Sequence, residues 1–195
     1  LYNAMINPLV PYSIKGAIWY QGESNVGRDA QYRRLFPNMI NGWREKWQAE
    51  FSFYFVQIAP FNYSPDPASH ISQKLREAQR KTLSTAKTGM VVTLDIGDVA
   101  NIHPANKQDV GSRLAGLALA NDYGKDLMAS GPLYRSMSSS GNKMILEFDY
   151  DLNGLKAGED ELKGFEIAGE NKVFSKAEAT IVNNTIVLSA SGIAE

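Results

Sequence analysis

The sequence of 195 residues predicts an α/β protein in two parts. Strand-like apolar segments alternate with amphipathic helical segments as far as residue 123, which is typical of a parallel sheet covered by helices on both faces. After residue 125 the helical periodicity stops, and short strands separated by turn residues follow. We therefore expect a three-layer α/β domain over residues 1–128 and an antiparallel β-sandwich module over residues 129–195. Each part has few strands, so we expect both to be incomplete.

The elements of the first part follow from residue type and spacing. Apolar, aromatic and β-branched residues predict buried strands at 14–20, 51–59 and 89–94. Apolar residues at three- and four-residue steps predict helices at 29–47, 71–84 and 106–123. Pro37 lies inside the first helix, where we expect a kink or a restart. Residues 1–9 are expected to be a helix tail or a loop, and the proline-containing residues 60–70 a loop.

The second part reads as short strands joined by turns. Strands are predicted at 144–148, 165–167 and 179–182. Asn183-Asn184 lies between two T-I-V segments and predicts a tight hairpin turn. Three or four such strands would leave open sheet edges.

Composition excludes several classes of function. The net charge is −1 and the pI is about 6.2, so neither nucleic acid nor an anionic membrane is an expected partner. No cysteine is present, which excludes disulfides, thiol catalysis and cysteine metal sites. With two histidines and no EF-hand spacing, we expect no metal site and no cofactor.

His103 is the main candidate for chemistry. It lies in D-I-G-D-V-A-N-I-H-P, the loop after the third predicted strand, where it could act as a general base toward a hydroxyl nucleophile. A surface or helix-capping histidine is the alternative. Asp98 and Asp95 precede it and could orient the imidazole or bind a cation, or Asp98 could simply turn the loop with Gly97.

A second candidate group follows the first predicted strand. Gln21, Glu23 and Asn25 offer hydrogen-bonding groups there, and an amide at a strand end can donate to a developing oxyanion. The alternative is a polar turn that caps the next helix. Ser24 in G-E-S-N imitates the G-x-S-x-G nucleophile elbow, but Val26 stands where the second glycine would be needed.

These segments resemble the sialate O-acetylesterase family of the SGNH (GDSL-like) hydrolase superfamily. The matching blocks cover nearly the whole chain and include I-K-G-A-I-W-Y-Q-G-E-S-N at 14–25, L-R-E-A-Q at 75–79, V-V-T-L-D-I-G-D at 91–98, I-H-P-A-N-K at 102–107 and G-P-L-Y at 131–134. The resemblance implies a partial SGNH-type, flavodoxin-like domain in an esterase that acts on acetylated sugars or glycans. It also implies a periplasmic or secreted protein.

The resemblance implies roles for individual residues. His103 would activate a serine in a G-Q-S-N-type turn, and the Gln21 amide would join backbone N–H groups around the oxyanion. Gln21 and Glu23 would lie at the pocket floor, and Gly22 and Asn101 would also bind the oxyanion or the substrate. No G-Q-S-N turn occurs in these residues, so we expect a missing N-terminal segment to supply the nucleophile and this fragment alone to be inactive.

The position three residues before His103, where many relatives have aspartate, is Ala100. Either the main-chain oxygen of Asn101 or the carboxylate of Asp98 would then orient the imidazole. Three rival interpretations remain: an acetylxylan-type esterase on the same scaffold, a non-catalytic carbohydrate-binding or structural module, and Ser24 as nucleophile of an active fragment.

Overall fold

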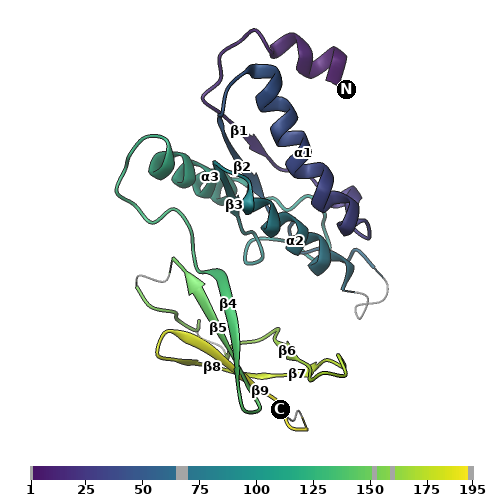
Figure 1. Cartoon of the computed structure of the whole chain (residues 1–195), viewed down its shortest axis with the longest axis vertical. Coiled ribbons are helices and arrows are strands. Elements are labelled where there is room, and N and C mark those ends of the chain that lie inside the picture. Colours follow the sequence, from purple (N-terminus) through teal and green to yellow (C-terminus); the bar gives the residue numbers. More distant parts are fainter. Residues whose placement is uncertain (1, 65–69, 151–152, 159–160, 193–195) are drawn as a thin grey trace. The chain divides into compact units, whose positions relative to one another are not determined.

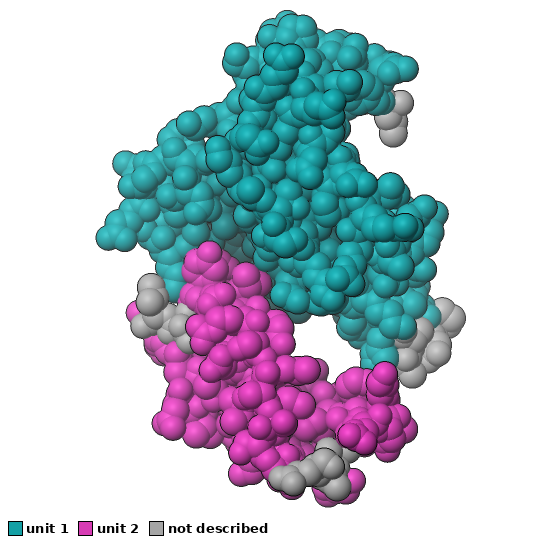
Figure 2. Space-filling view, in the orientation of Figure 1, with its two compact units in different colours: residues 1–129 teal, residues 130–195 magenta. Residues whose placement is uncertain are grey.

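The computed structural model describes residues 2–64, 70–150, 153–158 and 161–192. The chain divides into two compact units, residues 1–129 and residues 130–195, which are coloured separately in Figure 2. The sequence had placed the boundary between residues 128 and 129. Residues 65–69 of the predicted loop lie outside the described residues.

Unit 1 contains a parallel sheet of three strands in the order β1-β2-β3 (Figure 1). The strands are β1 (Gly16–Trp19), β2 (Ser52–Val56) and β3 (Thr88–Val91). Each is shorter than its predicted segment, because regular pairing ends before the apolar residues do. The predicted α/β class with a parallel sheet is confirmed, and all three strands have their carboxyl ends at one edge.

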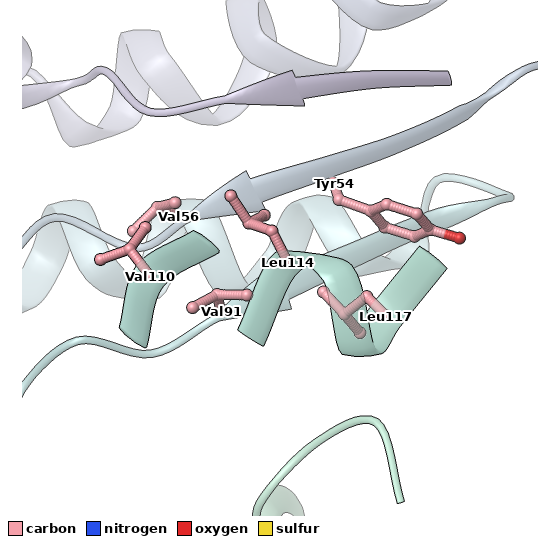
Figure 3. Close-up of a cluster of buried hydrophobic side chains, with 6 residues drawn as sticks. All are labelled: Tyr54, Val56, Val91, Val110, Leu114 and Leu117. Carbon is pink, nitrogen blue, oxygen red and sulfur yellow. The ribbon is translucent and has the colours of Figure 1, made fainter. Parts of the chain in front are cut away.

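Helices cover both faces of this sheet. Phe36 of α1 (Asp29–Trp47) packs edge-on against Phe53 and Phe55 of β2, and α2 (Ile71–Lys81) lies beside α1. The alternate β2 residues Tyr54 and Val56 point to the opposite face. There they form a buried cluster with Val91 and with Val110, Leu114 and Leu117 of α3 (Lys107–Asn121) (Figure 3).

The helix boundaries follow the local sequence with two corrections. Pro37 lies within α1, but the helix continues from Asp29 to Trp47, so the expected restart is wrong. The segment 71–84 divides into α2 and a 3₁₀ turn, Thr82–Ser84. The N-terminal residues form a π-helical turn, Tyr2–Ile6, and a 3₁₀ turn, Asn7–Leu9.

Unit 2 is antiparallel. Its larger sheet has the order β4-β5-β9-β8, formed by β4 (Leu133–Ser140), β5 (Lys143–Asp149), β8 (Glu178–Val182) and β9 (Thr185–Ser189). A smaller sheet pairs β6 (Glu166–Ile167) with β7 (Ser175–Lys176). Asn183 and Asn184 both have positive φ, 48° and 63°, which confirms the tight turn between β8 and β9. The sequence did not predict β4 or β7.

Candidate functional site

The turn after β1 is held in a conformation that requires glycine. Gly22 has φ 149°, and a Cβ there would lie 3.2 Å from Gln79 Nε2 and 3.3 Å from the Tyr32 hydroxyl. That hydroxyl also donates to the main-chain oxygen of Gln21 at 3.4 Å. The side chain of Gln21 is exposed. The buried contacts therefore fix the backbone of the turn and leave Gln21 exposed.

Two polar side chains of α2 fix the end of β2. Gln79 is fully buried, and its Oε1 accepts from the Ile58 N–H at 2.9 Å while its Nε2 donates to Val56 O at 3.4 Å. Arg76 donates to the carbonyls of Ile58 and Ala59 at 3.0 and 3.2 Å. Burial lowers the pKa of the Arg76 guanidinium. Since Gln79 also contacts the Gly22 turn, the ends of β1 and β2 are fixed to each other.

The loop after β3 is attached to the loop after β2. The Asn62 N–H donates to Val99 O at 3.0 Å, and a Cβ on Gly97 would lie 2.2 Å from Pro60 Cδ. A hollow of about 690 Å³ is lined by Phe61, Asn62, Val99 and Ala100. The two loops thus approach closely and leave a hollow at the edge of the sheet where the candidate residues lie.

The residues around His103 bond mainly to their own loop. Asp98 Oδ1 accepts from the Ala100 N–H, and Asn101 Oδ1 accepts from the His103 N–H, both at 2.9 Å. His103 itself is exposed, while Pro104 after it is buried and anchors the loop. Within the described residues no hydrogen bond reaches the imidazole, so its orienting partner, Asp98 or the Asn101 carbonyl, stays a prediction.

Tyr20 connects the first turn to the His103 loop. The Nζ of Lys107, which follows that loop and begins α3, lies 4.6 Å from the centre of the Tyr20 ring. Burial, and after it the negative charge of Glu23, raise the pKa of Tyr20, and a hydrogen bond with Thr93 offsets part of this rise. The turn after β1 and the segment 95–107 after β3 therefore meet at one edge of the sheet.

Tyr63 brings the loop after β2 to the same place. Burial is the main cause that raises the pKa of Tyr63 to about 12, and Glu23 contributes by its negative charge. Glu23 thus lies near the hydroxyls of both Tyr63 and Tyr20. Three loops that follow three parallel strands converge here, as expected for a ligand site at the carboxyl ends of such a sheet.

Two other predicted residues have structural partners. Ser24 lies in a 3₁₀ turn, Glu23–Asn25, and its carbonyl accepts from Arg28 at 2.6 Å. Asp95 forms a two-pronged ion pair with Arg113, whose nitrogens lie 2.8 and 2.6 Å from its oxygens. In the part of the chain that the structure describes, no three acidic or histidine side chains are grouped to hold a metal ion. No helix there is long and apolar enough to cross a membrane.

Sequence reasoning did not single out Tyr63, Arg76, Gln79 or Lys107 individually. One signal was available for Gln79, because it follows Leu75 and Ala78 on the buried face of α2, where an apolar residue is expected. Lys107 and Tyr63 carry no local signal, since only the topology brings them to Tyr20 and Glu23.

The comparisons with known proteins agree with one another. Residues 1–120 match the family described as "Carbohydrate esterase, sialic acid-specific acetylesterase". Curated proteins named sialate O-acetylesterase are similar: the rat protein is 32% identical over 86% of this chain, and the mouse protein 34% over 86%. The crystal structure of a carbohydrate acetylesterase from Xanthomonas citri covers 99% of this chain with 39% identity and a TM-score of 0.94.

These relatives are longer than the chain. The 195-residue chain spans 34% of the length of the rat and mouse proteins and 46% of the length of the Xanthomonas chain.

Proposed function

The chain belongs to the family of sialic acid-specific carbohydrate acetylesterases, and we propose that the full-length protein removes O-acetyl groups from sialic acid or a related acetylated sugar. The observation that carries the proposal is the contact of Lys107 with Tyr20, because it joins the turn that holds Gln21 to the loop that holds His103. An exposed imidazole and an exposed amide thereby belong to one edge of the sheet.

In the proposed reaction a serine hydroxyl attacks the acetyl carbonyl while His103 accepts its proton. The carbonyl oxygen becomes an oxyanion, which accepts a hydrogen bond from the Gln21 side-chain amide. Collapse of this intermediate breaks the bond to the sugar oxygen, which takes the proton from His103 and departs as a hydroxyl, and leaves an acetyl-serine. Water then attacks the acetyl-serine while His103 takes its proton, and His103 passes that proton to the serine oxygen as acetate is released.

We place the nucleophilic serine in a segment of the full-length protein outside these residues. The exposed side of β1 supports this. β1 is the outer strand of the described sheet, and Ile18 is 70% exposed although its neighbour on β2, Tyr54, is 4% exposed. Parallel sheets normally have both faces covered, so a further strand and helix from the full-length protein would complete the sheet beside the Gln21 turn.

The test is an assay of the full-length protein with an O-acetylated sialic acid, supported by fluorophosphonate labelling. We expect hydrolysis of the ester and a labelled serine outside residues 1–195. His103→Asn should lower kcat by about 10²–10⁴-fold because it removes the general base. His70→Asn is the matched control that should leave kcat unchanged, since asparagine tolerates the positive φ of 50° at that position.

Other outcomes would contradict the proposal. Labelling of Ser24 in the 195-residue chain would make Ser24 the nucleophile. Hydrolysis of acetylated xylan but not of acetylated sialic acid would assign a different sugar, and binding without hydrolysis would indicate a carbohydrate-binding module. An Asp98→Ala variant separates the two orienting groups: a loss of a few-fold favours the Asn101 carbonyl, whereas a loss of about 10⁴-fold assigns the role to Asp98.

A further inference from the structure

Lys107 presents a positive charge at the edge of the sheet where the candidate residues gather. Its Nζ lies 4.6 Å from the centre of the Tyr20 ring, so its nearest described partner there is an uncharged aromatic face. Among the described residues Lys107 takes part in none of the ion pairs, which join arginines and Lys81 to carboxylates elsewhere. Its three ammonium donors therefore remain available to a ligand.

The two neighbouring arginines, Arg76 and Arg113, already donate hydrogen bonds to other groups of the protein. Arg113 donates to both oxygens of Asp95 and to Val92 O. Arg76 is partly buried and donates to the carbonyls of Ile58 and Ala59. Neither guanidinium is free to turn toward a bound sugar without breaking these bonds.

The Tyr20 ring gives this charge a defined position. The face of an aromatic ring attracts a cation, and the Lys107 Nζ lies over the Tyr20 ring. Glu23 acts on the hydroxyls of Tyr20 and Tyr63, whereas Lys107 lies over the ring. Lys107 forms no ion pair with Glu23 among the described residues, and its ammonium lies over the ring of the residue that precedes Gln21.

We propose that Lys107 binds the carboxylate of an acidic sugar substrate and makes the enzyme prefer esters of acidic sugars over esters of neutral ones. The inference rests on the proposed function, in which the ester bond is attacked at the same edge of the sheet. An ionised carboxylate is the group that separates sialic acids from neutral acetylated sugars. A lysine ammonium recognises it as a point charge, without the fixed two-pronged geometry of arginine.

The test uses the full-length protein and two substrates that differ only at C1: an O-acetylated N-acetylneuraminic acid, which carries an ionised carboxylate there, and its uncharged C1 methyl ester. We expect wild-type protein to prefer the free acid. Lys107→Met keeps an unbranched apolar stem and should lower kcat/KM for the free acid by about ten-fold, mainly through KM, while the methyl ester is hydrolysed as before. Lys107→Arg should keep most of the preference.

Lys15 provides the matched control. Its Nζ also lies over a tyrosine ring, 5.8 Å from the centre of Tyr123, but it precedes β1 and so lies at the other end of that strand. Lys15→Met should leave the preference unchanged. Added salt should weaken the preference of the wild type, because it screens an exposed charge, and should not affect the methyl ester.

Three results would overturn the inference. If Lys107→Met lowers kcat/KM equally for both substrates, its role is structural. If that variant hydrolyses both substrates with the wild-type kcat/KM, the carboxylate is bound elsewhere. If wild-type protein hydrolyses the methyl ester and the free acid equally well, no carboxylate subsite exists, although the proposed esterase function stands. Wild-type protein that hydrolyses neither refutes the proposed function together with the inference.

Discussion

Replacing Gly22 by alanine tests whether buried contacts fix the turn that carries Gln21. Two costs add at this position. A non-glycine residue at φ 149° is strained, which costs about 1–3 kcal/mol. The new methyl group would also lie 3.2–3.4 Å from Gln79, Tyr32 and Ile58, and crowding of a packed site costs about 1–3 kcal/mol. We therefore expect Gly22→Ala to lower the free energy of unfolding of unit 1 by about 2–6 kcal/mol.

Gly27 allows the two costs to be separated. It belongs to the same connection between β1 and α1 and has φ 81°, but a Cβ there would meet nothing within 4 Å. Gly27→Ala should therefore show the backbone cost alone, about 1–2 kcal/mol. The difference between the two variants contains the crowding of Gln79 and Tyr32 by the added methyl group, together with the difference in backbone strain between φ 149° and φ 81°.

Urea unfolding followed by tryptophan fluorescence is a suitable assay. All three tryptophans, Trp19, Trp43 and Trp47, lie in unit 1, so the signal reports the unfolding of that unit and not of unit 2. The 195-residue chain is sufficient for this measurement. If Gly22→Ala destabilises unit 1 no more than Gly27→Ala does, the packing around Gly22 does not fix the turn, and the reasoning is wrong.

Two further predictions use the same assay. Asp122 accepts hydrogen bonds from the hydroxyls of Ser52 and Tyr54, so Asp122→Ala should cost about 1–3 kcal/mol by leaving both without this partner; an unchanged urea midpoint would contradict this. Hydrogen bonds from Arg113 lower the pKa of Asp95 below its ordinary value of 3.8. The ion pair therefore stabilises the fold fully when the pH is above 3.8, and this contribution is lost as the pH falls through the lowered pKa of the folded state. Because the pair is exposed, the loss is under about 1 kcal/mol, and Asp95→Asn should make the decline of the urea midpoint below about pH 4 shallower.

The helices were the most predictable part of the fold, because a buried helix face needs a regular apolar spacing. The prediction for residues 29–47 matches α1 from end to end. In contrast, β4 has the sequence L-Y-R-S-M-S-S-S, which contains few apolar or β-branched residues. It is a strand because it pairs with β5 at both of its ends, with a shift of register between Tyr134 and Ser136, and pairing between segments leaves no local signal.

The candidate site shows the same limit. The turn at Gln21 and the loop at His103 could be singled out, because polar residues directly after apolar strands interrupt a clear pattern. The approach of Lys107 to Tyr20 and of Glu23 to Tyr63 could not, since each pair joins loops that are distant in sequence. Only the parallel order of the strands brings these loops to one edge.

In the candidate site, buried side chains hold the backbone in place, and exposed side chains are the ones proposed to act on substrate. Gln79 and Tyr32 fix the first turn from below, and the close approach of Gly97 to Pro60 fixes the loops after β2 and β3 to each other. His103 and Gln21, which are proposed to act on substrate, are exposed, and the bond from Tyr32 reaches only the main-chain oxygen of Gln21 and not its side chain. Changes to the anchors should therefore lower stability together with activity, whereas changes to His103 should lower activity alone. A pocket whose frame is rigid before substrate arrives loses less entropy in the reaction, which is why anchoring by buried polar groups suits catalysis on loops.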